Sequence, residues 1–260
     1  MLGLMDLPDW LWRDEYEDRV PPGEAADVAI DETAAEFWIT VTRHDPTHRP
    51  VRSNDRANRS TPCYARSMTA ALKIPIRMIV AEFLAWNPPG AQTWQLIDGE
   101  PQAMAPATRT HGAIQGELSR RIGNHLENRG GACSLIVIPG VIPHVQSDTN
   151  MRVPDLAVTC SAYQTEEAAL TDPVLLIEIL SPSNPAETWA NVWAYTTIPS
   201  VQEILVVRTA TIGADLLRRN PDATWPKQPL SIADGDLVLD SIGFRVALAD
   251  IYRTTRLAAR

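Results

Sequence analysis

The stretch VLLIEILSPSN, residues 174–184, constrains the fold more than any other part of the chain. Its aliphatic residues leave no polar face, which is typical of a strand that is covered on both sides. Glu178 interrupts this run. A lone carboxylate there would lose its hydration or stay protonated. Glu178 is therefore either a glutamate hydrogen-bonded near a strand end or a ligand of a divalent cation, which reverses the local charge preference.

The segments around this strand predict a mixed α/β sheet. We expect a hairpin at 93–106 with Asp98-Gly99 as its turn, and then a helix at 110–131 with Thr110 as its cap. Residues 133–145 are expected to form one strand, or two that are broken at Pro139-Gly140. Further strands are expected at 151–160, 172–183 and 201–209, a helix at 184–200, and strands and turns in the last fifty residues. From residue 110 the order is αβββαβ. The helix between the third and fourth strands implies a parallel crossover, and the strands before it are expected to be antiparallel.

The helix at 110–131 carries an apolar stripe at i, i+4 spacing, made by Ile114, Leu118, Ile122 and Leu126. His111 lies two turns before Leu118, on or beside the same face. We therefore expect the imidazole to point toward the sheet. A histidine that simply packs with the apolar stripe is the alternative.

Two carboxylates are placed to converge on the sheet. Asp155 stands in VPDLAV, just inside the second strand, and Glu178 stands in the third. If these strands are neighbours, the two acids meet at one point, where they cannot both ionise without help. Two carboxylates with water ligands suit Mg²⁺ or Mn²⁺. A strand-edge aspartate beside a buried, protonated glutamate is the alternative.

The chain resembles a known superfamily in five segments: LIDGEPQAMAP, the following His111, RVPDLAV, LLIEILSPSN, and the helix that ends VWAY before VQEILVV. With the αβββαβ order, they resemble the PD-(D/E)XK restriction-endonuclease-like superfamily, and more closely its Uma-two family. The resemblance covers about residues 90–252. It implies a restriction-endonuclease-like core that hydrolyses DNA phosphodiester bonds with Mg²⁺ or Mn²⁺. It also implies Asp155 and Glu178 as metal ligands, with Glu100 and His111 completing the site.

One departure from the superfamily concerns its lysine. The slot beside the strand-three glutamate holds Leu180, and the helix position four residues before Tyr195, where related families carry the lysine, holds Asn191. Asn191 can orient a water or a phosphate oxygen but cannot act as a base. Three functions stay open: a nuclease with His111 as proton shuttle, a catalytically inactive nuclease fold that binds nucleic acid or a partner protein, and a hydrolase of smaller phosphate esters.

Charge and cysteine content bear on partners and compartment. The net charge of −9 argues against a broad basic face for nucleic acid but not against local contact at a metal site. Cys63, Cys133 and Cys160 show no paired spacing, which predicts unpaired thiols and a cytoplasmic location. No stretch predicts a membrane span. The expected partner is nucleic acid, DNA before RNA, and a homodimer is left open.

The first part of the chain differs in composition from the rest. Residues 1–67 are acid-rich and contain no lysine, and residues 43–66 lack apolar periodicity. We expect 1–67 to be a poorly ordered extension and 68–260 to be the nuclease-like domain, beginning with an amphipathic helical stretch from Met68.

Overall fold

The computed structural model describes residues 77–88, 90–162, 168–182 and 185–258. The extension expected at 1–67 lies outside these residues, as does the start of the helical stretch expected from Met68. Of that stretch the described part contains helix α2 (Val80–Ala85). The boundary after residue 67 therefore stays a prediction.

The central element is a six-stranded mixed sheet with the order β3-β4-β5-β6-β7-β8. Its strands are β3 (Ser134–Val137), β4 (Leu156–Thr159), β5 (Pro173–Leu180), β6 (Glu203–Arg208), β7 (Ala214–Arg218) and β8 (Leu230–Ile232). β5 and β6 are parallel, and the other neighbouring pairs are antiparallel. The expected mixed sheet, with one parallel crossover after three antiparallel strands, is confirmed.

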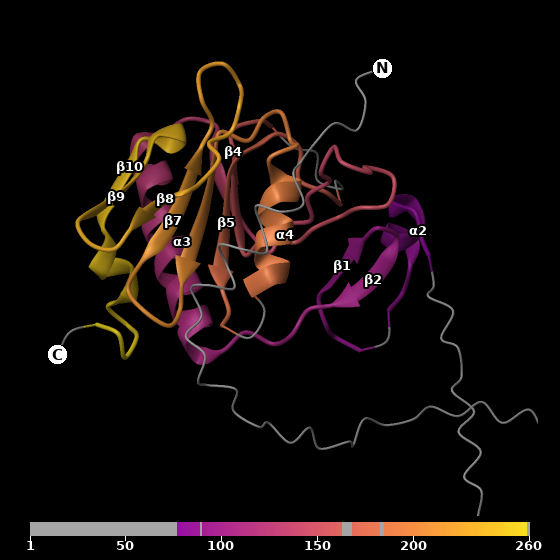
Figure 1. Ribbon diagram of the computed structural model, residues 1–260, viewed down its shortest axis with the longest axis horizontal. Coiled ribbons are helices and arrows are strands. Elements are labelled where there is room, and N and C mark those ends of the chain that lie inside the picture. The colour runs from indigo at the N-terminus through magenta and orange to yellow at the C-terminus, as the bar shows by residue number, and fades with distance from the viewer. Residues whose placement is uncertain (1–76, 89, 163–167, 183–184, 259–260) are drawn as a thin grey trace, which may run out of the picture. The chain divides into compact units, whose positions relative to one another are not determined.

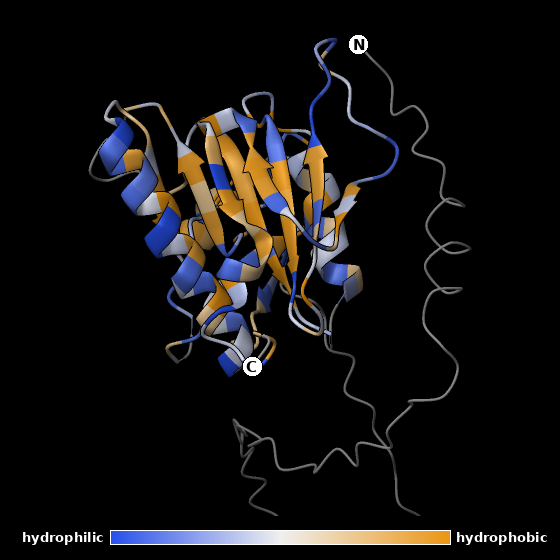
Figure 2. Ribbon diagram, turned by 90° about the vertical axis from the view of Figure 1, so that its left-hand side faces the viewer, coloured by the Kyte–Doolittle hydropathy of each residue, from blue (hydrophilic) through white to orange (hydrophobic). Residues whose placement is uncertain are grey.

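Two helices cover opposite faces of this sheet (Figure 1). Helix α3 (Arg109–Arg129) packs on the face that carries Ile177, and helix α4 (Pro185–Tyr195) packs on the face that carries Leu176. Successive residues of a strand point to opposite faces, so β5 needs apolar residues at both. Figure 2 shows the resulting strands as almost continuously hydrophobic.

Helix α3 begins slightly earlier than the sequence predicts, because its cap is Thr108 and not Thr110. The Thr108 hydroxyl accepts a hydrogen bond from the backbone N–H of His111 at 3.2 Å, which satisfies one of the free donors at the helix start. The helix ends at Gly130, whose φ of 69° favours glycine. The predicted stripe is buried: Ile114, Leu118, Ile122 and Leu126.

A hairpin precedes α3, as predicted, with strands β1 (Trp94–Ile97) and β2 (Glu100–Ala103). Asp98 and Gly99 at its turn have positive φ, 50° and 84°, which suits a tight two-residue turn. The hairpin is joined to the segment before β4 by backbone hydrogen bonds between Leu96 and Met151. The tip is tied to the same segment, because the Asn150 amide donates to the Asp98 carboxylate at 3.1 Å.

The end of the chain forms a second antiparallel pair, β9 (Asp236–Leu239) and β10 (Phe244–Ala247). Two short 3₁₀ helices, η1 (Asp240–Ile242) and η2 (Leu248–Tyr252), accompany it. Their apolar side chains extend the core on the α3 face of the sheet. Across the residues that the structure describes, no helix combines the length and apolar character needed to cross a membrane.

The expectation of unpaired cysteines is wrong for two of them. Cys133 and Cys160 form a disulfide across 27 residues of sequence. They precede β3 and follow β4, and the antiparallel register that pairs Ser134 with Thr159 continues to this pair. Linear spacing does not reveal such a pairing, because strand register sets it. Cys63 lies outside the described residues.

Candidate active site

Asp155 and Glu178 converge as the sequence predicts. In the antiparallel pairing of β4 with β5, Leu156 is opposite Ile177, so the same register places Asp155 opposite Glu178. Asp155 stands just before β4 and not inside it. Its Oδ2 accepts a hydrogen bond from the backbone N–H of Ile179 at 2.7 Å. This contact holds the Asp155 carboxylate against the backbone of Ile179, the residue that follows Glu178.

His111 points toward the sheet, as predicted, and reaches Asp155. Its Nε2 lies 2.8 Å from Asp155 Oδ1, and only 14% of the imidazole side chain is exposed. One turn further along α3, the Gln115 amide donates to the Asp155 backbone carbonyl at 3.0 Å. The first two turns of α3 therefore hold the aspartate from a second direction, and the imidazole contacts Asp155 in addition to packing beside the apolar stripe.

Glu178 is buried, with 6% of its surface exposed. The Tyr195 hydroxyl donates to its Oε1 at 2.7 Å, and the Asn191 side chain also hydrogen-bonds to it. Burial raises the pKa of Glu178 well above its ordinary value, and the charge of Asp155 raises it further. The two hydrogen bonds oppose this shift. The site therefore contains a carboxyl group that resists ionisation, and a nearby cation would stabilise its charged form.

Asn191 occupies the position on α4 where the resemblance leads one to expect a lysine. It contacts both the guanidinium of Arg152 and the carboxyl group of Glu178. Its Oδ1 accepts from Arg152 Nη1 at 3.0 Å. Arg152 Nη2 donates in turn to Asn150 Oδ1 at 2.9 Å. Arg152 is itself buried, with 6% exposure. Asp155, Glu178, His111 and Asn191 thus lie in one connected set of contacts that also includes Arg152.

Glu100 does not join this set. It lies on β2 and forms a long ion pair with Arg77 at 3.6 Å, and 42% of its side chain is exposed. Among the described residues no hydrogen bond or ion pair connects it to the other four predicted site residues. The acid that the structure brings near is Glu187, in the first turn of α4. Its charge contributes to raising the pKa of Glu178.

Sequence reasoning did not identify Arg152, Glu187 or Tyr195 as site residues. Glu187, Asn191 and Tyr195 follow one another at i, i+4 and i+8, so they share a face of α4, and this spacing was a usable signal. Arg152 is harder to recognise from the sequence, because an arginine three residues before Asp155 is equally typical of a solvent-exposed residue. Its burial depends on contacts with residues far away in the sequence.

The chemistry of the donors suits a hard cation. Within the described ranges no group of three or more His, Cys, Asp or Glu side chains is arranged to hold a metal ion. Mg²⁺ does not require such a cage, because it is commonly held by one or two carboxylates together with waters and substrate phosphate oxygens. Asp155 and Glu178 supply those two carboxylates, so the residues present fit Mg²⁺ or Mn²⁺.

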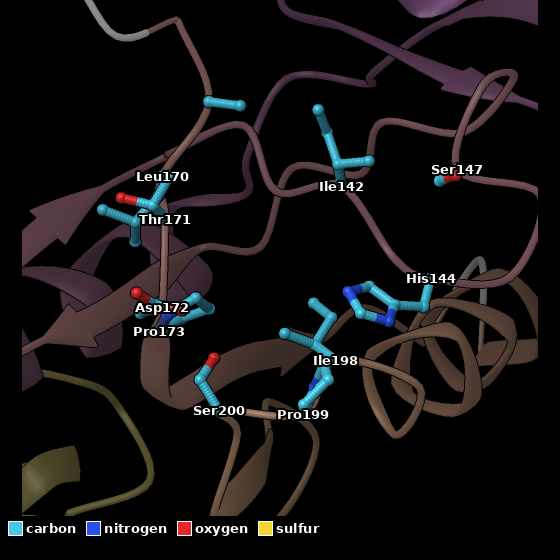
Figure 3. Close-up of a pocket in the computed structure, with 11 residues that line it drawn as sticks. Ile142, His144, Ser147, Leu170, Thr171, Asp172, Pro173, Ile198, Pro199 and Ser200 are labelled. Atoms are coloured by element: carbon cyan, nitrogen blue, oxygen red, sulfur yellow. The ribbon is translucent and has the colours of Figure 1, made fainter.

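A separate pocket of about 660 Å³ lies away from these residues (Figure 3). It is lined at the start of β5 by Thr171, Asp172 and Pro173, and beyond α4 by Ile198 and Ser200, with His144 beside Ile198. None of the five predicted site residues lines it. Glu178 stands near the other end of β5 from this pocket.

The fold is nuclease-like, a mixed sheet between helices, and an acidic pair lies where β5 meets the residue that precedes β4. The chain belongs to the Uma2 family, whose model, described as "Putative restriction endonuclease", matches residues 80–249. It is similar to the uncharacterized protein slr1290 of Synechocystis sp., with 31% identity over 174 residues, covering 66% of this chain and 90% of that protein.

A solved structure supports the fold. It is that of a protein from Anabaena variabilis described as "a putative nuclease belonging to DUF820". The TM-score is 0.54 with 17% sequence identity, and the match covers 67% of this chain and 97% of that one.

Proposed function

We propose that this protein is a metal-dependent endonuclease that hydrolyses DNA phosphodiester bonds. The observation that carries the proposal is the convergence of Asp155 and Glu178, in which Asp155 Oδ2 is bound to the Ile179 backbone N–H at 2.7 Å. Membership of a family described as "Putative restriction endonuclease" supports the substrate class. The acidic pair supports the proposed cofactor class, Mg²⁺ or Mn²⁺.

Each residue of the site has a part in this reaction. Asp155 and Glu178 would hold the metal, which when bound activates water and offsets charge on the phosphate. His111, 2.8 Å from Asp155, orients that carboxylate and is placed to move a proton. Tyr195 and Asn191 fix the orientation of the Glu178 carboxylate. Burial of Glu178 keeps bulk water from competing for its oxygens.

A catalytically inactive protein that binds nucleic acid or a partner protein is the second candidate. Asn191 favours it, because an amide at this position offers neither a base nor a positive charge to the phosphate. The net charge of −9 does not favour it, since binding of nucleic acid without chemistry depends largely on basic contacts to phosphates.

Two measurements test the proposal. Calorimetric titration with Mn²⁺ should show binding to the wild type and none to Asp155→Ala or Glu178→Ala. Asp236→Ala is the matched control, because Asp236 pairs with Arg245 on the surface of β9. A plasmid-nicking assay with and without EDTA then separates the candidates. Metal-dependent nicking that is lost in both variants supports the endonuclease, and Mn²⁺ binding without nicking of any nucleic acid refutes it.

A further inference from the structure

Arg152 is a buried cation with an unusual set of partners. Its two terminal nitrogens donate to neutral amide oxygens, of Asn191 at 3.0 Å and Asn150 at 2.9 Å. Within the described part of the chain, its Nε is buried without a hydrogen-bond partner. A buried guanidinium normally has a directly bonded carboxylate, because its desolvation is costly. The acids that balance its charge therefore act on it over a longer distance, without a direct hydrogen bond.

The acids around Arg152 identify where that compensation comes from. Asp98, Glu187 and Glu178 all act on it electrostatically. Asp98 and Glu178 are each reached through one amide side chain, Asp98 through Asn150 and Glu178 through Asn191, which accepts from Arg152 and also hydrogen-bonds to Glu178. Asp98 is exposed, whereas Glu178 is buried. The geometry is a relay of three side chains from guanidinium to amide to carboxylate.

The backbone of Arg152 is held in place independently of its side chain. Its N–H and C=O are both paired with Val141, each at 2.8 Å. The residue also stands three positions before Asp155, on the same segment that enters β4. The backbone is thus fixed on the segment that leads to Asp155, and the hydrogen bonds to Asn191 and Asn150 hold the guanidinium, which is what a fixed electrostatic contribution requires.

We propose that Arg152 is a positioning residue that supplies the positive charge of the site, acting through Asn191 on Glu178. This inference deepens the proposed function and rests on it. Helix α4 carries no lysine or arginine, and Arg152 provides the cation from the segment before β4 instead. Asn191 is then a working part of the relay and not simply a residue left where a base was lost.

The relay can be tested by moving the charge. In Asn191→Lys an ammonium would face the guanidinium, so the site has two cations. In Arg152→Met it has none, the Asn191 oxygen loses its Arg152 donor, and the Asn150 oxygen keeps only the Asp98 backbone N–H. The double variant has one cation again, on α4. We expect each single variant to melt below the wild type, and the double variant to melt above both, which is non-additivity of the kind that coupled neighbours show.

Metal binding and cleavage provide the second readout, measured on the full chain. Asn191→Lys should weaken Mn²⁺ binding about tenfold, because it adds a positive charge beside the ligands, and the double variant should recover that loss. Cleavage should fall by about tenfold or more in each single variant and recover in the double variant.

Arg208→Met is the control for loss of an arginine that only stabilises. Arg208 is partly buried and bound to Asp215 on β7 and to Ser231 on β8. This variant should melt lower while Mn²⁺ affinity stays unchanged.

The outcomes separate the inference from the proposed function. If the double variant melts at or below the lower of the two single variants, Arg152 is structural and the relay is refuted. If the wild type cleaves no nucleic acid but the melting and Mn²⁺ cycles show recovery, the proposed endonuclease fails while the charge relay is supported.

Discussion

The hydroxyl of Tyr195, at the last residue of α4, donates a 2.7 Å hydrogen bond to Glu178 Oε1 on β5. Both residues are buried, and Tyr195 is wholly so. Burial raises the pKa of Tyr195 well above its ordinary value, and the charge of Glu178 raises it further. The phenol therefore stays a donor throughout the working pH range and holds the carboxylate in one orientation.

Tyr195→Phe should destabilise the metal-free protein by about 1–3 kcal/mol, because a buried carboxyl oxygen loses its donor. The lost hydrogen bond is also one that lowers the pKa of Glu178, so the loss of stability at rising pH should become steeper. Thermal melting across a pH series measures both effects. Tyr252→Phe is the control, since its hydroxyl binds backbone carbonyls elsewhere. It should lower the melting temperature without changing the pH slope.

The pH dependence of stability follows from Glu178. Its pKa is raised above the ordinary value of 4.5, so the folded state binds a proton more tightly than the unfolded state. Stability of the metal-free protein is therefore greatest below pH 4.5, as far as this group is concerned, and falls as pH rises through the raised folded pKa. A tenfold difference in proton affinity between the two states corresponds to about 1.4 kcal/mol of stability. Thermal melting across a pH series should show this decline, and added Mn²⁺ should reverse it.

Glu178→Gln isolates this contribution. The amide oxygen can still accept from Tyr195, while the buried charge is gone, so the metal-free variant should melt above the wild type at pH 7 and show a flatter pH series. Glu203→Gln should instead melt below the wild type at pH 7. Glu203 is as buried, but its carboxylate has an arginine and two donors from Ser241. A Glu178→Gln variant that melts below the wild type at pH 7 would contradict the assignment.

His111→Ala should reduce cleavage by about 10²-fold or more, because it removes the group that orients Asp155 and moves a proton. His125→Ala on the same helix is the control, since its ring bonds to the Ile242 carbonyl. That variant should cost stability and leave the cleavage rate unchanged. Equal losses of cleavage in the two variants would remove His111 from the reaction.

The boundary at residue 67 predicts that a chain beginning at Met68 folds alone. Residues 68–260 are sufficient for an independent core. The melting temperature of this shorter chain should match that of the full chain, as measured by circular dichroism. Aggregation, or a melting temperature far below that of the full chain, would show that Trp10, Trp12, Phe37 or Trp38 belong to the folded domain.

The disulfide predicts the thiol count. Of the three cysteines, two are joined, so alkylation of the denatured, unreduced protein should label only Cys63. After reduction, three cysteines should be labelled. Mass spectrometry distinguishes these species directly. Labelling of three cysteines without reduction would instead support the unpaired thiols and the cytoplasmic location expected from the sequence.

The parts of the fold that depend on local pattern were predictable. The double-sided aliphatic run of β5, the Asp98-Gly99 turn and the stripe of α3 each carry their periodicity in adjacent residues. The convergence of Asp155 and Glu178 was also predictable, because the element order makes their strands neighbours. The helix cap was misplaced by two residues, since Thr108 and Thr110 offer the same hydroxyl and only the backbone path distinguishes them.

What the sequence did not reveal depends on register and on contacts between distant segments. The Cys133–Cys160 pair follows from how β3 aligns with β4, and the Arg152–Asn191 contact joins residues 39 positions apart. Glu100 shows the converse. Glu100 was predicted as a site residue because it matches a short motif of the family. The structure gives it Arg77 as an ion-pair partner, and its role stays a prediction.

The parallel pairing of β5 with β6 has a consequence for how the protein folds. Glu178 lies on β5, while Asn191 and Tyr195 lie on the helix that connects β5 to β6. A parallel pair cannot form until its crossover has closed, and such non-local closure is slow compared with hairpin formation. The carboxylate would thus obtain its partners late, when most of the sheet is already assembled. The pairing of Tyr195 with Glu178 during refolding would report completion of the native topology, and the newly made chain would complete this candidate site only as its last contacts form.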